Sequence, residues 1–152
     1  MKFIAELEEA ILEEDFYKTN EVLEKIKQEE NAFEYLAFVF RIMETNPELD
    51  YGMPGPVVHF MESFYRNGYE ELLLKSIQNM PTSHTVWMLN RVINDPGLNN
   101  RDMYIGVLKA LLDRSDIPQL VRKDIENFLK YHSIEKTVKK SWKERLFKFG
   151  VR

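Results

Sequence analysis

The sequence of 152 residues contains no cysteine. That absence excludes disulfide bonds, thiolate zinc sites and cysteine nucleophiles, and it fits a reducing compartment. No apolar run approaches the ~20 residues that a membrane-spanning helix needs. The N-terminal segment interrupts its apolar residues with glutamates, unlike a secretory signal peptide. We therefore expect a cytoplasmic protein that is not exported by this route and does not bind a membrane.

The usual sequence signatures of enzymes are missing as well. No segment matches HExxH, GxGxxG, GxxxxGK[ST] or GxSxG, and no paired CxxC can occur. His59 and Glu62 are three residues apart on one predicted helix, and with His84 they could bind a metal or act as an acid/base pair. Two such residues at this spacing are common by chance. We therefore predict a non-catalytic protein with no metal, no cofactor and no small-molecule substrate.

Charge is distributed unevenly along the chain, whose formal net charge is −4. Residues 1–50 contain 14 acidic and 5 basic side chains, whereas residues 101–152 contain 7 and 13. The acidic end could meet a basic partner, and the basic end a nucleic acid or a membrane surface. Solvated helix faces at both ends are an equally good interpretation.

Apolar residues recur at helical spacing along nearly the whole chain, and no segment reads as a β-strand. This pattern predicts about nine helices joined by mostly short loops, and therefore an all-α fold. We expect a HEAT-like stack of antiparallel helix pairs with irregular repeats, because no constant sequence period is visible. The expected organisation is a single domain over residues 1–152 with a basic C-terminal helix at residues 135–152.

Capping chemistry predicts where several helices begin and end. Side-chain oxygens favour the position before a helix, and proline is tolerated in its first turn. Predicted starts are at Asp15, Pro56, Thr82 or Ser83, Asp116 and Ser133. A left-handed turn at Asn67 and Gly68 is predicted to end the helix that begins at Pro56.

Two predicted helices, beginning at Pro56 and near Ser83, carry a polar stripe on the face turned away from their apolar residues. Trp87 lies in the second stripe beside an arginine and amides, which is the composition of a protein-interface hot spot. Packing of Trp87 between neighbouring helices is an equally good interpretation. The predicted partner-binding residues are His59, Glu62, Arg66, His84, Trp87, Asn90, Arg91 and Asn94.

The predicted last helix, residues 135–152, contains seven basic and two acidic residues. It could bind phosphate groups or anionic lipid, with Trp142, Phe147 and Phe149 as anchors. The acidity of the whole chain favours instead a packed helix with a solvated basic face. A helical scaffold or nucleic-acid-binding protein that uses this helix remains the alternative function, although nucleic acid is not the expected partner.

Two segments, PGPVVHFMESFY from Pro54 to Tyr65 and PTSHTVWMLNRVIN from Pro81 to Asn94, resemble small all-α immunity proteins of bacterial polymorphic toxin and contact-dependent inhibition systems. The resemblance implies an intracellular antitoxin that binds the C-terminal domain of a cognate toxin and blocks it without chemistry of its own. If that toxin is a nuclease, the acidic N-terminal half would suit its basic surface. The basic C-terminus departs from a simple acidic inhibitor and leaves room for an acidic toxin or a nucleic-acid partner.

Overall fold

The structure is a computed structural model that describes residues 1–149. Its described residues are all-helical, as predicted, and contain no strand. The elements are α1 (Ile4–Leu12), α2 (Phe16–Ile26), the 3₁₀ helix η1 (Ala32–Glu34), α3 (Tyr35–Thr45), α4 (Pro56–Glu62), α5 (Tyr69–Asn79), α6 (Ser83–Asn94), α7 (Arg101–Leu112) and α8 (Gln119–Phe149). Within the described part of the chain, no helix is both long enough and apolar enough to cross a bilayer.

The helices belong to two compact units. The first unit, Met1–Pro96, contains α1 to α6, and the second begins at Gly97 and contains α7 and α8. The expectation of a single domain over residues 1–152 stays a prediction. Charge separates along the same boundary, because residues 1–96 contain 18 acidic and 8 basic side chains, and the remainder contains 7 and 13.

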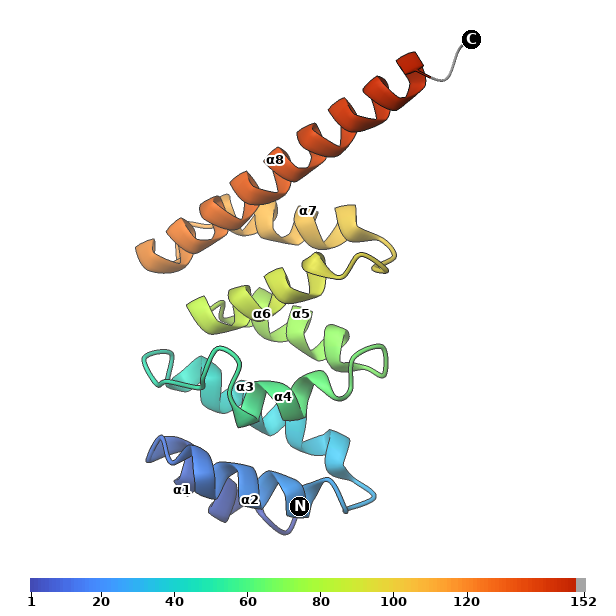
Figure 1. The fold of residues 1–152 in the computed structure, drawn as a ribbon. Coiled ribbons are helices and arrows are strands. Elements are labelled where there is room, and N and C mark those ends of the chain that lie inside the picture. Colours follow the sequence, from blue (N-terminus) through green and yellow to red (C-terminus); the bar gives the residue numbers. More distant parts are fainter. Residues whose placement is uncertain (150–152) are drawn as a thin grey trace. The chain divides into compact units, whose positions relative to one another are not determined.

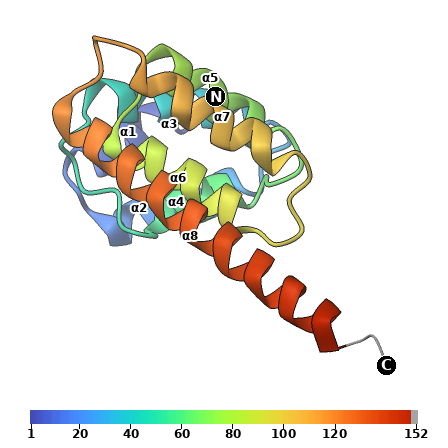
Figure 2. The ribbon, with the colours of Figure 1, turned by 90° about the horizontal axis from the view of Figure 1, so that it is seen from above.

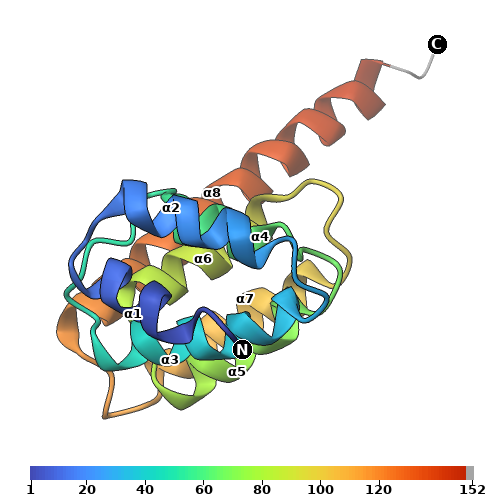
Figure 3. The same ribbon diagram turned by 90° about the horizontal axis from the view of Figure 1, so that it is seen from below.

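The first unit has two layers of helices. Its helices follow one another as antiparallel pairs, with α1 and α2 at one end and α5 and α6 at the other (Figure 1). Seen along the stack, α1, α3 and α5 form one layer and α2, α4 and α6 form the other (Figure 3). Contacts run along each layer, from α2 to α4 and from α3 to α5, as well as between α5 and α6. The HEAT-like description of this stack stays a prediction.

Large side chains fill the space between the two layers. Tyr35, Tyr51 and Tyr69 are fully buried, together with leucine, isoleucine and methionine side chains from all six helices. Each aliphatic side chain buried in this way contributes roughly 1.5–3 kcal/mol. Two of the tyrosines also fix loops, because the Tyr35 hydroxyl accepts from the Phe3 backbone N–H at 3.1 Å and the Tyr51 hydroxyl donates to the Asn46 carbonyl at 2.8 Å.

Three of the predicted helix starts are confirmed. Asp15 caps α2 by accepting from the Lys18 backbone N–H at 2.9 Å, and Pro56 is the first residue of α4. Thr82 caps α6, because its hydroxyl accepts from the Thr85 backbone N–H at 3.1 Å. In return, the Thr85 hydroxyl accepts from the Thr82 backbone N–H, also at 3.1 Å. These caps satisfy backbone donors that have no partner inside the helix. The start of α6 is therefore rigidly defined, and this start sets the direction in which its side chains point.

The predicted extent of α4 was wrong, because the helix ends at Glu62 and turns occupy residues 63–68. The Glu70 carboxylate accepts from the Arg66 backbone N–H with both oxygens at 3.0 Å, which replaces the helical hydrogen bond at that position. Arg66 adopts a left-handed backbone with φ of 64°, and Gly68 does so with φ of 99° immediately before α5. Arg66 therefore does not continue the outward stripe of α4.

The predicted helix break at Ser133 was also wrong. A single helix, α8, runs through it for 31 residues (Figure 2). The Ser133 hydroxyl donates to the Lys130 carbonyl at 2.9 Å, so this residue bonds back into the helix instead of capping a new one. The predicted basic helix is thus the C-terminal part of α8. Trp142 is exposed on it, whereas the side chains of Phe147 and Phe149 lie outside the described residues.

Two glycines should respond to alanine substitution in opposite directions. Gly68 has a left-handed backbone conformation, which is unfavourable for alanine, and a Cβ atom added there would lie 2.8 Å from the Phe33 ring. Gly68→Ala should therefore destabilise the protein by about 1–2 kcal/mol. At Gly106, inside α7, a Cβ would meet no atom within 4 Å, so Gly106→Ala should stabilise by roughly 0.5–1 kcal/mol. Urea unfolding followed by circular dichroism measures both. A neutral Gly68→Ala would contradict the left-handed entry to α5.

Candidate functional site

Three side chains of α6 lie on one face of the helix, at i, i+3 and i+7. The His84 and Trp87 rings meet edge to face, with centroids 5.3 Å apart, and the Arg91 guanidinium lies 5.1 Å from the centre of the Trp87 ring. Tyr51 packs against the other side of His84, with centroids 5.1 Å apart. Trp87 is half-buried, and its ring lies between the side chains of His84 and Arg91. Such aromatic and cation–π contacts each contribute about 0.5–1.5 kcal/mol.

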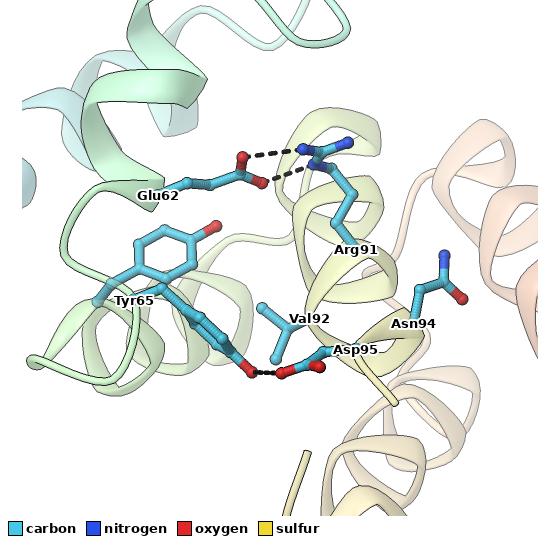
Figure 4. Close-up of a pocket in the computed structure, with 7 residues that line it drawn as sticks. Glu62, Tyr65, Arg91, Val92, Asn94 and Asp95 are labelled. Atoms are coloured by element: carbon cyan, nitrogen blue, oxygen red, sulfur yellow. Dashed lines mark hydrogen bonds and ion pairs between the residues drawn. The ribbon is translucent and has the colours of Figure 1, made fainter. Parts of the chain in front are cut away.

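Arg91 also joins α6 to α4 through a bidentate ion pair with Glu62 (Figure 4). The Arg91 Nε donates to one Glu62 carboxylate oxygen at 2.6 Å and a terminal guanidinium nitrogen donates to the other at 2.9 Å. Both side chains are partly buried, with 35% of Arg91 and 22% of Glu62 exposed. The carboxylate raises the pKa of Arg91 through this hydrogen bond, so the guanidinium stays charged. Two parallel hydrogen bonds fix the guanidinium plane as well as its position.

A pocket of about 460 Å³ lies beside this ion pair. It is lined by Glu62, Tyr65, Tyr69, Arg91, Val92, Asn94 and Asp95. At its far side the Tyr65 hydroxyl donates to Asp95 at 2.8 Å (Figure 4). The Arg66 guanidinium reaches the same Asp95 oxygen at 3.1 Å and lies 5.4 Å from the centre of the Tyr65 ring. Two carboxylate–arginine pairs thus flank the pocket, each with an aromatic ring against its arginine.

Tyr69 places a buried hydroxyl in the wall of this pocket. Its side chain is fully buried, and the hydroxyl oxygen has no hydrogen-bond partner among the described residues. Burial raises the pKa of Tyr69, and the nearby Glu62 carboxylate raises it further. Leaving a buried hydroxyl without a partner costs about 1–3 kcal/mol, which the packing around it must offset.

The structure brings most of the predicted partner-binding residues to this face of the first unit. Glu62, His84, Trp87 and Arg91 form one connected cluster, while Arg66 contacts Asp95 and Asn94 lines the pocket. Asn90 is half-buried on α6, and His59 is exposed on α4. Their role in binding stays a prediction.

Four residues that line the pocket were not predicted, namely Tyr65, Tyr69, Val92 and Asp95. The proximity of Tyr65 to Asp95, thirty residues apart, depends on tertiary packing that helical periodicity does not report. The one usable signal was the presence of aromatic and acidic residues at the ends of the two stripes.

The polar and aromatic side chains of the cluster formed by Glu62, His84, Trp87 and Arg91 contact one another. Both oxygens of Glu62 accept from Arg91, and His84 contacts Tyr51 and Trp87. Within the part of the chain that the structure describes, no group of three or more metal-ligating side chains could hold a metal ion. Comparisons with protein-family models, curated proteins and solved structures find no match to this chain.

His84 makes the stability of the first unit sensitive to pH. Burial lowers the pKa of His84 below its ordinary value of 6.5, against smaller opposing contributions from the Asp50 carboxylate and a hydrogen bond to the Gly52 backbone. The unfolded chain then binds a proton more readily than the folded one. The contribution of neutral His84 is fully present above the unfolded-state pKa and is lost as the pH falls below it.

We expect His84→Gln to reduce the pH dependence of thermal unfolding. The fall in Tm between about pH 7.5 and pH 5.5 should be smaller than in the wild type by roughly 2–5 °C. His59→Gln, which alters an exposed histidine of the same unit, serves as the matched control and should follow the wild type. Differential scanning calorimetry gives the three curves. An identical fall in the wild type and in His84→Gln would show that His84 is not protonated on unfolding in this range.

Proposed function

We propose that this chain is a non-catalytic protein-binding module, and specifically an immunity protein that binds and neutralises the C-terminal domain of a cognate bacterial toxin. The observation that carries the proposal is the fixed arrangement of Trp87 between His84 and Arg91, with Arg91 locked to Glu62. The assignment as an immunity protein comes from the resemblance of residues 54–65 and 81–94 to such proteins. These two segments form α4 with its following turn, and α6.

A pre-organised tryptophan and arginine are what a high-affinity interface requires. Binding energy in protein complexes concentrates in a few tryptophan, tyrosine and arginine side chains near the centre of the interface. Fixing a flexible side chain on binding costs about 0.5–1.5 kcal/mol. Trp87 and Arg91 are already held in the free chain, so this cost is largely removed for both. The adjoining pocket gives a partner side chain a place to insert beside them.

The charge of the first unit supports a basic partner. Residues 1–96 contain 18 acidic and 8 basic side chains. On α1, the exposed Glu9 pairs with Lys18 at 2.8 Å and the half-buried Glu6 pairs with Lys25 at 3.1 Å. A surface of this sign attracts a positively charged protein and accelerates its approach. A nuclease with a basic substrate-binding surface is the toxin class that fits this charge best.

Inhibition in this proposal is steric and electrostatic. The chain needs no metal, cofactor or small-molecule substrate to block a toxin, because it acts by covering the surface that the toxin uses. The alternative of catalysis by His59, Glu62 and His84 finds no support in the geometry, since the Glu62 carboxylate is engaged by Arg91 and His84 by two aromatic rings.

Retention of a partner from the native cell tests this proposal. Tagged wild type should co-purify with the C-terminal domain of a large secreted protein, identified by mass spectrometry. Trp87→Ala and Arg91→Ala should each weaken that complex by about 2 kcal/mol or more, which is roughly thirtyfold in Kd. Tyr17→Ala removes a side chain that is 77% exposed on α2, and it should bind like the wild type.

Two results would contradict the proposal. If Trp87→Ala and Arg91→Ala stay folded and bind the partner as tightly as the wild type, the site does not lie on this face of α6. If only nucleic acid co-purifies, is released by salt and is insensitive to both substitutions, the immunity function fails and the basic helix becomes the binding site.

A further inference from the structure

The helix α8 carries an apolar stripe exposed to solvent. Tyr131, Ile134, Val138 and Trp142 follow one another at intervals of three, four and four residues, and their exposed fractions are 59%, 54%, 49% and 65%. At 100° per residue these four side chains fall within about 80° of the helix circumference. The stripe spans roughly 16 Å along the helix at 1.5 Å per residue. An exposed apolar row of this length marks a surface that another molecule covers.

This stripe is distinct from the face that packs on α7. Val121, Ile125 and His132 are buried, and His132 lies with Ile105 of α7 in the wall of a small cavity of about 80 Å³. Lys136 extends from the same side of α8 and pairs with Asp102 of α7 at 2.6 Å. That face is centred about 120° around the helix from the stripe. Within the second unit, α7 thus covers one face of α8, and the apolar stripe on the other face stays exposed.

The width of the stripe favours another helix as its occupant. A helix that lies in a membrane surface buries a broad apolar face, whereas a helix that pairs with one other helix needs only a narrow seam at alternating intervals of three and four. Tyr131, Ile134 and Val138 fit such a seam. Lys140 lies on the opposite side of the helix from the stripe and would point away from a lipid surface.

The charged residues near the stripe determine which kind of helix can bind there. Residues 130–145 contain six basic and two acidic side chains. Lys139 pairs with Glu135 at 2.5 Å, but Lys130 and Arg145, which lie beside the stripe, are exposed and have no acidic partner among the described residues. A second copy of α8 laid along the stripe would bring these cations together, and like charges side by side are destabilising. An acidic helix would pair with them.

We propose that the exposed stripe of α8 binds one acidic amphipathic helix of a partner protein. Apolar side chains of that helix pack between Tyr131, Ile134, Val138 and Trp142, and its carboxylates lie beside Lys130 and Arg145. This surface belongs to the second unit and shares no residue with the Trp87 face. The inference therefore stands or fails independently of the proposed immunity function.

A synthetic peptide of three heptads, with leucine or isoleucine at the a and d positions and glutamate at most others, is the probe. We expect saturable binding of the fluorescein-labelled peptide to the full chain, measured by anisotropy. The double variant Ile134→Ser/Val138→Ser should weaken binding at least about tenfold, because it removes the centre of the apolar seam. Leu12→Ser/Tyr17→Ser alters two exposed apolar residues of the first unit and should bind like the wild type.

Further controls separate the acidic helix from other occupants. A peptide with lysine in place of glutamate should not bind, and raising the salt concentration should weaken the glutamate peptide. Equal binding of the glutamate peptide to wild type and double variant would overturn the proposal. So would a failure of that peptide to bind while vesicles of phosphatidylcholine with phosphatidylserine bind the wild type and not the double variant. A dimer in sedimentation velocity that the double variant abolishes would assign the stripe to a second copy instead.

Discussion

The bidentate contact between Glu62 and Arg91 is the interaction on which the candidate face of the first unit depends. It connects the last residue of α4 to the last turn of α6, and it holds the guanidinium over the ring of Trp87. A lysine could neutralise Glu62 but could not form two parallel hydrogen bonds while stacking on an indole. The pair therefore determines where the tryptophan lies as well as how the two helices pack.

The buried hydroxyl of Tyr69 is a local energetic cost at this face. Its oxygen lies in the pocket wall with no hydrogen-bond partner among the residues that the structure describes, and a phenylalanine there would avoid that cost. Sequences depart from locally optimal choices mostly at functional or strained sites. The acidic first unit and the basic second unit then offer two chemically different surfaces on one chain.

Local sequence chemistry predicted the helices well and their ends less well. Apolar spacing identified the all-α class, and the side chains of Asp15 and Thr82 marked helix starts because capping involves only neighbouring residues. The end of α4 was misplaced because Glu70, beyond the turn, accepts from the Arg66 backbone. The predicted polar stripes included Glu62 and Arg91, but periodicity reports only which face of a helix a residue occupies. That these two residues meet across 29 positions is a property of the packed fold.

The arrangement of this face requires that Glu62 immobilises Arg91 in the free chain. The most direct test is the ¹⁵N heteronuclear NOE of the Arg91 Nε–H group, measured beside that of Arg41, which is exposed on α3. The structure predicts that Arg91 Nε–H is nearly as rigid as the backbone amides of α6, that Arg41 is much more mobile, and that Glu62→Gln releases Arg91. An Arg91 Nε–H group as mobile as that of Arg41 in the wild type would contradict the account.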